Sequence, residues 1–279
     1  MNFDLLDRVV VVSGGTSGIG LACALALARD GAHVAILGTD AKRMQESVAL
    51  VEAAGEGRSR VLGLLVDVCE PTVLATVAES VATRLGPVWG IIACAGIGGA
   101  SKAEDLSLAD LNRVLAVNVG GVLSTCQAFV HGMLERRRGS IVLVGSINSF
   151  GGQPGRVHYT ASKHAVVGLV KNLAIDWGRF GVRVNGIAPG PVDTPLLRRN
   201  VPPGFFARVF EDRIPLGRLA RSEEIANSCL MLLSDASSFV NGAMLVVDGG
   251  MTAGPFTHRG GADMGSNRLL AAGAYEEVE

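Results

Sequence analysis

The sequence predicts an α/β fold built on a single doubly wound parallel sheet of seven strands, with helices on both faces. Seven short apolar runs recur along the chain, and segments with a helical pattern lie between them. Parallel strands covered on both faces read as continuous apolar runs, and strands alternating with helices give βαβ units with right-handed crossovers. The expected strands are Val9–Val12, Val34–Leu37, Val61–Val66, Val88–Ala93, Ile141–Val144, Val182–Ile187 and Met244–Val247.

The segments between these runs carry apolar residues three and four positions apart, which is the period of a helix. Two long helices are expected at about 107–135 and 157–178. No internal repeat or linker interrupts the pattern, so residues 1–250 are expected to form one domain. Residues 191–221 contain five prolines and three phenylalanines. They predict a lid over a site or, alternatively, an extra surface helix. Residues 251–279 form a C-terminal extension.

Composition and charge exclude several classes of protein. The 279 residues are 48% hydrophobic, and 25 basic residues balance 26 acidic ones to a net charge of -1. This balance gives no reason to expect nucleic acid or an anionic membrane as a partner. The five cysteines form no CxxC pair, so neither a disulfide scaffold nor a metal site is expected. No run reaches the about 18–20 uninterrupted apolar residues of a membrane span, and a reducing cytoplasm is the expected compartment.

A glycine-rich turn follows the first strand and opens a helical pattern. Glycines at 14, 18 and 20 permit a tight turn and close approach of the backbone to a pyrophosphate. The N–H groups and positive dipole of the helix start would hold the phosphates. The spacing Gly14-x3-Gly18-x-Gly20 differs from the G-x-G-x-x-G fingerprint, but its place directly after an apolar strand favours dinucleotide binding.

The ends of the second and third strands bear on the adenosine half of such a ligand. Asp67 ends the third strand, where its carboxylate either accepts from an adenine amino group or caps the next helix. An acid at the end of the second strand would bind the ribose hydroxyls, and a basic residue would favour a 2′-phosphate. Neither stands at Gly38 or Thr39. Asp40 comes two residues late, and the basic residues Lys42 and Arg43 follow it, so the signal is mixed.

Tyr159 and Lys163 lie four residues apart at the start of a helical pattern, and therefore on one helix face. Free tyrosine has a pKa of about 10, and a nearby ammonium favours the phenolate. Such a pair is a usable acid and base near neutrality. Ser146 directly follows the fifth strand, at the edge where open parallel sheets bind ligands, and its hydroxyl could hold a substrate oxygen.

In order and spacing, these residues resemble the short-chain dehydrogenase/reductase family, whose members have a Rossmann fold. The resemblance covers roughly residues 5–250. The matching positions are Gly14, Gly18, Gly20, Asn118, Ser146, Tyr159-x3-Lys163, Pro189-Gly190 with Thr194, and the ending Val247-Asp248-Gly249-Gly250.

The resemblance implies a role for each of these residues. Tyr159 would be the general acid/base, Ser146 its hydrogen-bond partner, and Lys163 the group that assists Tyr159 and holds the nicotinamide ribose. Asn118 would keep a water that links Lys163 to solvent. The resemblance implies that the cofactor is bound by Gly14, Ser17, Gly18, Ile19, Gly20, Thr39, Asp67, Val68, Ala95, Gly96, Tyr159, Lys163, Pro189, Gly190, Val192 and Thr194.

The sequence departs from the family pattern at three places. Ser13 stands where threonine is usual, and Ala93-Cys94-Ala95-Gly96 replaces Asn-Asn-Ala-Gly, so a strand tether loses its side chains. The third departure is the mixed signal at the end of the second strand. No arginine stands at position 17 or 39, where members that prefer NADP often have one, which favours NAD over NADP.

The resemblance implies an NAD(P)-dependent oxidoreductase that interconverts a secondary alcohol and its ketone. The apolar lid predicts a hydrophobic or cyclic substrate. One alternative is a reductase of a carrier-bound 3-oxoacyl substrate that docks on Arg136–Arg138, and another is a nucleotide-binding scaffold without turnover. A homotetramer or dimer is expected through the two long helices, whose apolar residues include Val122, Phe129, Val166 and Leu169. The expected substrate pocket contains Asn148, Gln153, Arg156, Val192, Leu197, Phe205, Phe206 and Phe210.

Overall fold

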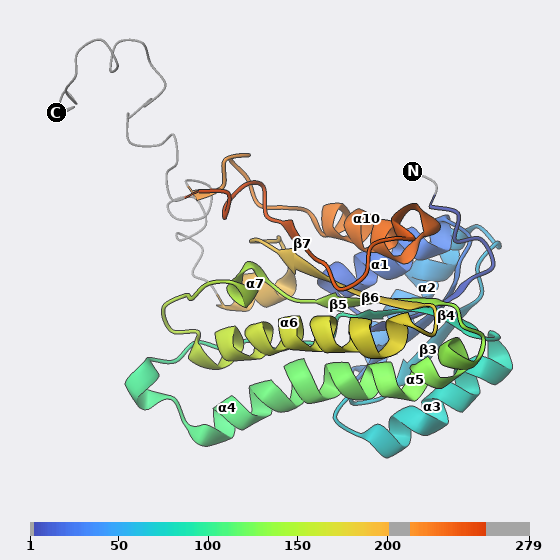
Figure 1. The fold of residues 1–279 in the computed structure, drawn as a ribbon, viewed down its shortest axis with the longest axis horizontal. Coiled ribbons are helices and arrows are strands. Elements are labelled where there is room, and N and C mark those ends of the chain that lie inside the picture. Colours follow the sequence, from blue (N-terminus) through green and yellow to red (C-terminus); the bar gives the residue numbers. More distant parts are fainter. Residues whose placement is uncertain (1–2, 201–212, 255–279) are drawn as a thin grey trace, which may run out of the picture.

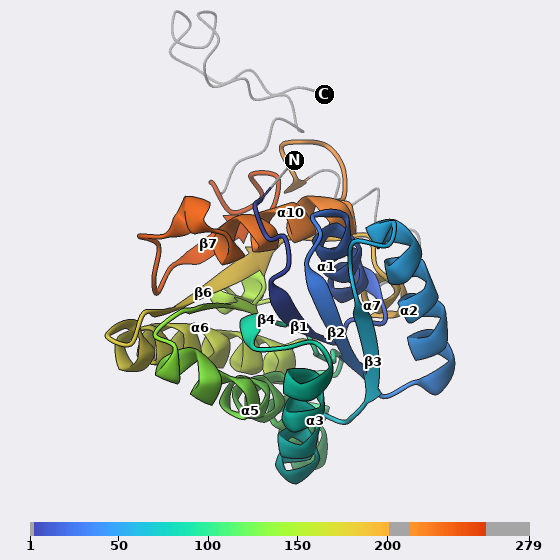
Figure 2. The same cartoon turned by 90° about the vertical axis from the view of Figure 1, so that its right-hand side faces the viewer.

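A computed structural model describes residues 3–200 and 213–254 of the chain. Its centre is one seven-stranded sheet in the order β3-β2-β1-β4-β5-β6-β7 (Figures 1 and 2). Every neighbouring pair of strands is parallel, so the predicted sheet is confirmed. The strands are β1 Val9–Ser13, β2 His33–Gly38, β3 Val61–Leu65, β4 Val88–Ala93, β5 Gly139–Val144, β6 Val182–Pro189 and β7 Met244–Val247.

Helices cover both faces of this sheet, as predicted. In Figure 1, α1, α2 and α10 lie above the sheet, and α3, α4, α5 and α6 lie below it. The two faces bury separate apolar clusters, to which β1 contributes alternate residues: Val10 and Val12 on one side, Val9 and Val11 on the other. The helices are α1 Gly18–Arg29, α2 Ala41–Gly55, α3 Pro71–Arg84, α4 Leu108–Leu115, α5 Val122–Glu135, α6 Val157–Gly178, α7 Pro195–Asn200 and α10 Ser222–Leu233.

The expected long helix at about 107–135 is interrupted. A π-helical turn, Ala116–Gly121, separates α4 from α5, and it holds Asn118 fully buried. Such turns are frequent at functional sites. By length and composition alone the run Leu108–Glu135 could cross a membrane. It packs against α3, α6 and β4, as a core helix of a folded domain does.

The apolar residues expected to mark a subunit interface lie instead in the core of the chain itself. Val122, Phe129 and Val166 are at most 5% exposed and face the sheet, with Leu169 packed against them. The prediction that Val122, Phe129 and Val166 form a contact between subunits is therefore wrong, because the sheet covers them; Leu169 is only partly buried, and its place in such a contact stays a prediction. A dimeric or tetrameric assembly stays a prediction.

Arg183 on β6 fixes the end of α10 to the sheet. Its guanidinium donates to the carbonyl oxygens of Leu232, Leu233 and Ser234 at 2.9–3.0 Å. These carbonyls belong to the last turn of α10, which lacks intrahelical donors. Arg183 therefore acts as a tertiary cap for α10, and burial lowers the pKa of its guanidinium.

We predict that Arg183→Met lowers the free energy of unfolding by about 2–4 kcal/mol, since several carbonyls lose a charged donor. Urea denaturation followed by circular dichroism measures this difference. The matched control is Arg58→Met, whose side chain is 55% exposed and whose loss should cost less than about 0.5 kcal/mol. Equal stabilities of the two variants would contradict the assignment.

Candidate active site

The glycine-rich turn after β1 packs against two other loops at the carboxyl edge of the sheet. Gly14 and Gly18 have φ of +66° and +50°. A Cβ on Gly14 would lie 2.8 Å from Ala95 Cα, and one on Gly20 would clash with the Gly14 carbonyl oxygen. A Cβ on Gly18 would approach Thr194 Cγ2 at 3.2 Å. The backbone approach therefore requires glycine, and it brings together the loops after β1, β4 and β6.

The amino end of α1 is open toward this edge. Its N-cap residue, Ser17, makes no side-chain capping bond, and the first turn contains no acidic residue. The first N–H groups of a helix have no intrahelical partner and attract anions. Strand β1 lies between β2 and β4, where the strand order reverses and open α/β sheets bind dinucleotides. A glycine cradle with an uncapped helix fits the pyrophosphate of such a ligand.

The neighbouring strand ends carry a mixed set of polar groups. Asp40 caps α2, because its carboxylate accepts from the Arg43 N–H at 3.0 Å. Thr39 is exposed beside it.

Asp67 does not cap α3, so the alternative in which its carboxylate caps that helix is wrong. The N-cap of that helix is Glu70, and the Asp67 carboxylate accepts from the Cys69 N–H at 2.9 Å within a turn. The adjacent Val68 is buried, and its side chain fills the space beside Gly121.

Tyr159 and Lys163 occupy successive turns at the start of α6, as predicted. The Lys163 Nζ lies 5.6 Å from the centre of the Tyr159 ring and donates to the Val144 carbonyl at the end of β5, at 2.8 Å. Lys163 is 6% exposed. Its ammonium is therefore held beside the tyrosine by a strand rather than by solvent.

Asn118 joins the loop after β4 to the tyrosine helix. Its Oδ1 accepts from the Ile97 N–H at 2.8 Å, and its Nδ2 donates to the Ile97 carbonyl at 2.9 Å and to Ser162 Oγ at 3.0 Å. The Ser162 hydroxyl donates in turn to the Tyr159 carbonyl at 2.7 Å. Ser162 was not predicted, although its place between Tyr159 and Lys163 is a signal that could have identified it.

Ser146 follows β5 and begins a 3-10 turn, Ile147–Ser149. Its Oγ accepts from the Asn148 N–H at 3.2 Å. The Asn148 side chain donates to Gln153 Oε1 at 3.3 Å and to Thr160 Oγ1 at 3.4 Å. Two predicted pocket residues, Asn148 and Gln153, are therefore in contact, and they connect the segment of Ser146 to α6.

The loop after β4, where Ala93 and Cys94 replace two asparagines of the family pattern, is still joined to β1 by hydrogen bonds from its backbone. The Cys94 N–H donates to the Ser13 carbonyl at 3.2 Å, and the Ala95 N–H donates to Ser13 Oγ at 3.3 Å. The hydroxyl of Ser13 thus serves as acceptor. Burial raises the pKa of the Cys94 thiol to about 12, so this side chain is a neutral packing group.

The loop after β6 reaches the same edge of the sheet. The Gly190 N–H donates to the Val247 carbonyl at 3.0 Å, and a Cβ on Gly190 would lie 2.8 Å from Asp248 Cβ. Val192 is buried, and Thr194 Oγ1 accepts from the Leu197 N–H at 3.2 Å at the start of α7.

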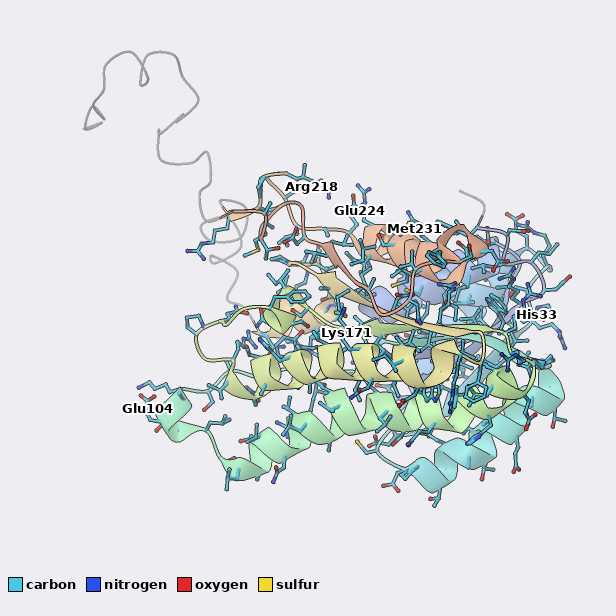
Figure 3. The ribbon with its side chains drawn as sticks, in the orientation of Figure 1. His33, Glu104, Lys171, Arg218, Glu224 and Met231 are labelled. Atoms are coloured by element: carbon cyan, nitrogen blue, oxygen red, sulfur yellow. The ribbon has the colours of Figure 1, made fainter. Side chains whose placement is uncertain are left out.

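The predicted lid is described at its two ends only. Leu197 on α7 packs with Leu219 and Met251 around Ile214. Beyond Ile214, an ion pair of 2.7 Å between Arg218 and Glu224 fastens the chain to α10. The bond from Arg218 lowers the pKa of Glu224 to about 2. Figure 3 shows this pair and Lys171 of α6 on opposite faces of the sheet. Phe205, Phe206 and Phe210 lie outside the described residues.

Comparison with known proteins identifies the family to which this chain belongs. Residues 14–252 match the family model described as enoyl-(acyl carrier protein) reductase. The chain is 36% identical over 258 residues to 2-(S)-hydroxypropyl-CoM dehydrogenase 3 of Xanthobacter autotrophicus, covering 91% of this chain and 100% of that protein. It is 38% identical over 251 residues to D-threitol dehydrogenase of Mycolicibacterium smegmatis, covering 90% and 95%.

A solved structure agrees with these sequence relatives. The crystal structure of levodione reductase superposes with a TM-score of 0.85 at 31% identity, covering 89% of this chain and 99% of that chain. The family uses NAD(P), and its named relatives are dehydrogenases and reductases. The chain therefore belongs to the short-chain dehydrogenase/reductase family and is an NAD(P)-dependent oxidoreductase that interconverts alcohols and ketones.

Proposed function

We propose that this chain oxidises a hydrophobic or cyclic secondary alcohol, or reduces the corresponding ketone, with Tyr159 as the acid/base. The observation that carries the proposal is the fixed position of Tyr159 and Lys163. Lys163 is bound to β5, and Tyr159 is linked through Ser162 to Asn118. These groups share the carboxyl edge of the sheet with the open end of α1.

In this mechanism Tyr159 as phenolate takes the proton from the alcohol, and as neutral phenol it gives the proton back when the ketone is reduced. The Lys163 ammonium, held by the Val144 carbonyl, stabilises the phenolate, which is the starting base in oxidation and the product of proton transfer in reduction. Ser146 would orient the substrate oxygen with its hydroxyl. When bound, NAD(P) supplies the carbon that accepts or donates the hydride.

The glycine turn, the first turn of α1, and the loops after β4 and β6 would hold NAD(P). Gly14, Ser17, Gly18, Ile19 and Gly20 would face the pyrophosphate. Thr39, Asp67, Val68, Ala95 and Gly96 would contact the adenosine half and ribose, and Pro189, Gly190, Val192 and Thr194 the nicotinamide. The water that Asn118 is inferred to hold stays a prediction. The Asn118 side chain itself makes three hydrogen bonds, two to the backbone of Ile97 and one to Ser162 Oγ.

NAD is the preferred cofactor in this proposal. The end of β2 offers the neutral Thr39, and Arg43, the nearest arginine in sequence, is 3.5 Å from Asp40. Near this strand end a 2′-phosphate would meet the carboxylate of Asp40, and of the two cations that follow, Lys42 and Arg43, Arg43 is already paired with that carboxylate.

The two alternative functions have less support. The three arginines Arg136–Arg138, on which an acidic carrier protein would dock, are each partly engaged within the chain. Arg136 donates to the Val88 carbonyl, Arg137 donates to the Arg179 carbonyl, and Arg138 stacks on Trp89. A scaffold without turnover has no need for Asn118, Ser146, Tyr159 and Lys163 together.

We predict that Tyr159→Phe lowers kcat by about 10²–10⁴-fold, because the proton acceptor is lost. Binding of NAD+ should change by less than threefold, as measured by calorimetry. The control is Tyr275→Phe, which removes the only other tyrosine hydroxyl in the sequence and should leave kcat within twofold. Full activity of Tyr159→Phe would contradict the proposed role.

Gly20→Ala tests the phosphate cradle. The new Cβ would meet the Gly14 carbonyl and displace the turn, so we expect the Kd for NAD+ to rise at least about tenfold, or 1.4 kcal/mol. A fluorescence titration with NADH should show a similar increase in the Kd of the reduced cofactor. The control is Gly168→Ala on α6, where a Cβ meets open space. An unchanged Kd in Gly20→Ala would contradict a cofactor site at this turn.

Cofactor preference is a separate prediction. With one alcohol at saturation, kcat/KM for NAD+ should exceed that for NADP+ at least about tenfold, the equivalent of 1.4 kcal/mol in transition-state binding. Initial rates at varied cofactor concentration give both constants. A preference for NADP+ would overturn the assignment to NAD but leave the acid/base role of Tyr159 intact.

A further inference from the structure

We propose that Arg156 binds an anionic group on the substrate, and that the substrate is therefore a secondary hydroxy acid or keto acid. The inference rests on the proposed function, because it specifies the substrate of the Tyr159 site. It adds one requirement, an acidic group such as a carboxylate on the carbon skeleton that bears the reacting oxygen.

Arg156 is a buried cation without an ion-pair partner among the described residues. It is 9% exposed and is the least exposed arginine of the described ranges. Its Nη1 donates to the Gly99 carbonyl, and its Nη2 donates to the Asn200 carbonyl at 2.9 Å. A guanidinium carries five N–H donors, so donors remain beyond these two bonds.

The position of Arg156 connects this cation to the acid/base. It is the N-cap residue of α6, three residues before Tyr159. A Cβ on Gly98 would lie 3.9 Å from Arg156 Nη1, 3.9 Å from Tyr159 Cδ2 and 3.6 Å from Asn200 Nδ2. The guanidinium, the tyrosine ring and the Asn200 amide therefore surround the same point above Gly98.

The electrostatics at this point favour an anion. Taking a cation out of water is costly unless an opposite charge compensates it. Burial lowers the pKa of Arg156, and Tyr159 partly offsets this effect. Burial and the charge of Arg156 also lower the pKa of the adjacent His158, whose Nδ1 has no hydrogen-bond partner. A carboxylate here would pair with Arg156 in the fork geometry that guanidinium groups favour.

Two hydrogen bonds, to carbonyls of two different segments, hold the guanidinium in place. Gly99 belongs to the loop after β4, and Asn200 is the last residue of α7. A purely structural clasp between this loop and α7 is the rival explanation. A clasp would affect every substrate alike, whereas an anion site affects only substrates that carry the charge.

The experiment compares matched alcohols that differ in one charge. The probes are 3-hydroxybutyrate, 4-hydroxypentanoate and 5-hydroxyhexanoate, each against its methyl ester, with the full-length protein and NAD+. For the best pair, the wild type should give a higher kcat/KM for the acid. In Arg156→Gln, the acid-to-ester ratio of kcat/KM should fall about 10- to 100-fold, the range expected for a lost charged hydrogen bond.

Two further variants separate charge from structure. Arg156→Lys keeps a cation without the fork and should retain part of the ratio. Arg113→Gln removes a cation on α4 whose side chain is 60% exposed, and it should leave the ratio unchanged. Thermal melts compare the folding of all three variants with the wild type.

Calorimetry gives a readout that does not need turnover. The hydroxy acids are titrated into Tyr159→Phe protein saturated with NAD+, with and without Arg156→Gln, and binding should be lost in the double variant. An unchanged ratio in Arg156→Gln with lower rates for both members, or no binding of any hydroxy acid, would overturn the anion site. Turnover of esters that depends on Tyr159, with no preference for acids, would also overturn it but leave the proposed function standing.

Discussion

The candidate active site depends on the hydrogen bonds of one buried amide. Asn118 binds both polar backbone groups of Ile97 and, through Ser162, the first turns of the tyrosine helix. The π-helical turn is what carries this side chain inward at the junction of α4 and α5. An unmade bond to a buried amide costs about 1–3 kcal/mol, so the loop after β4 and α6 keep one relative position.

Around this link, each strand end contributes one part of the site. The turn after β1 brings the open end of α1, β4 brings the loop that packs on Gly14, and β5 brings Ser146 and the carbonyl that holds Lys163. These parts meet because all seven strands are parallel and their carboxyl ends share one edge. The opposite edge serves stability, as the cap that Arg183 provides for α10 illustrates.

The fold was predictable because its signals are local. A strand such as β1, buried on both faces, reads as an apolar run, and the turn that follows it needs glycine at specific positions. The Tyr159 and Lys163 pair was predictable for the same reason, since spacing alone puts both on one helix face. The assignment of Val122 and Phe129 to a subunit interface failed, because an apolar helix face looks the same whether a sheet or a second subunit covers it.

Features that depend on contacts between distant segments could not be predicted. The partners of Asn118 and of Arg156 belong to segments far from them in the sequence. The N-cap position of α3, at Glu70 rather than Asp67, depends on where the helix begins, which differs by a few residues between equally plausible patterns. Contacts of this kind determine which substrate binds more than they determine the fold, because one sheet can carry many different loops.

The most direct test of the central claim follows the transferred hydrogen. The protein would be incubated with NAD+ and a panel of secondary alcohols deuterated at the carbinol carbon, and the reduced cofactor analysed by mass spectrometry. The account predicts deuterium in the reduced cofactor for at least one alcohol, and at least about 10²-fold less in the same time with the Tyr159→Phe protein. Tight binding of NAD+ with no deuterium transfer from any alcohol would contradict it.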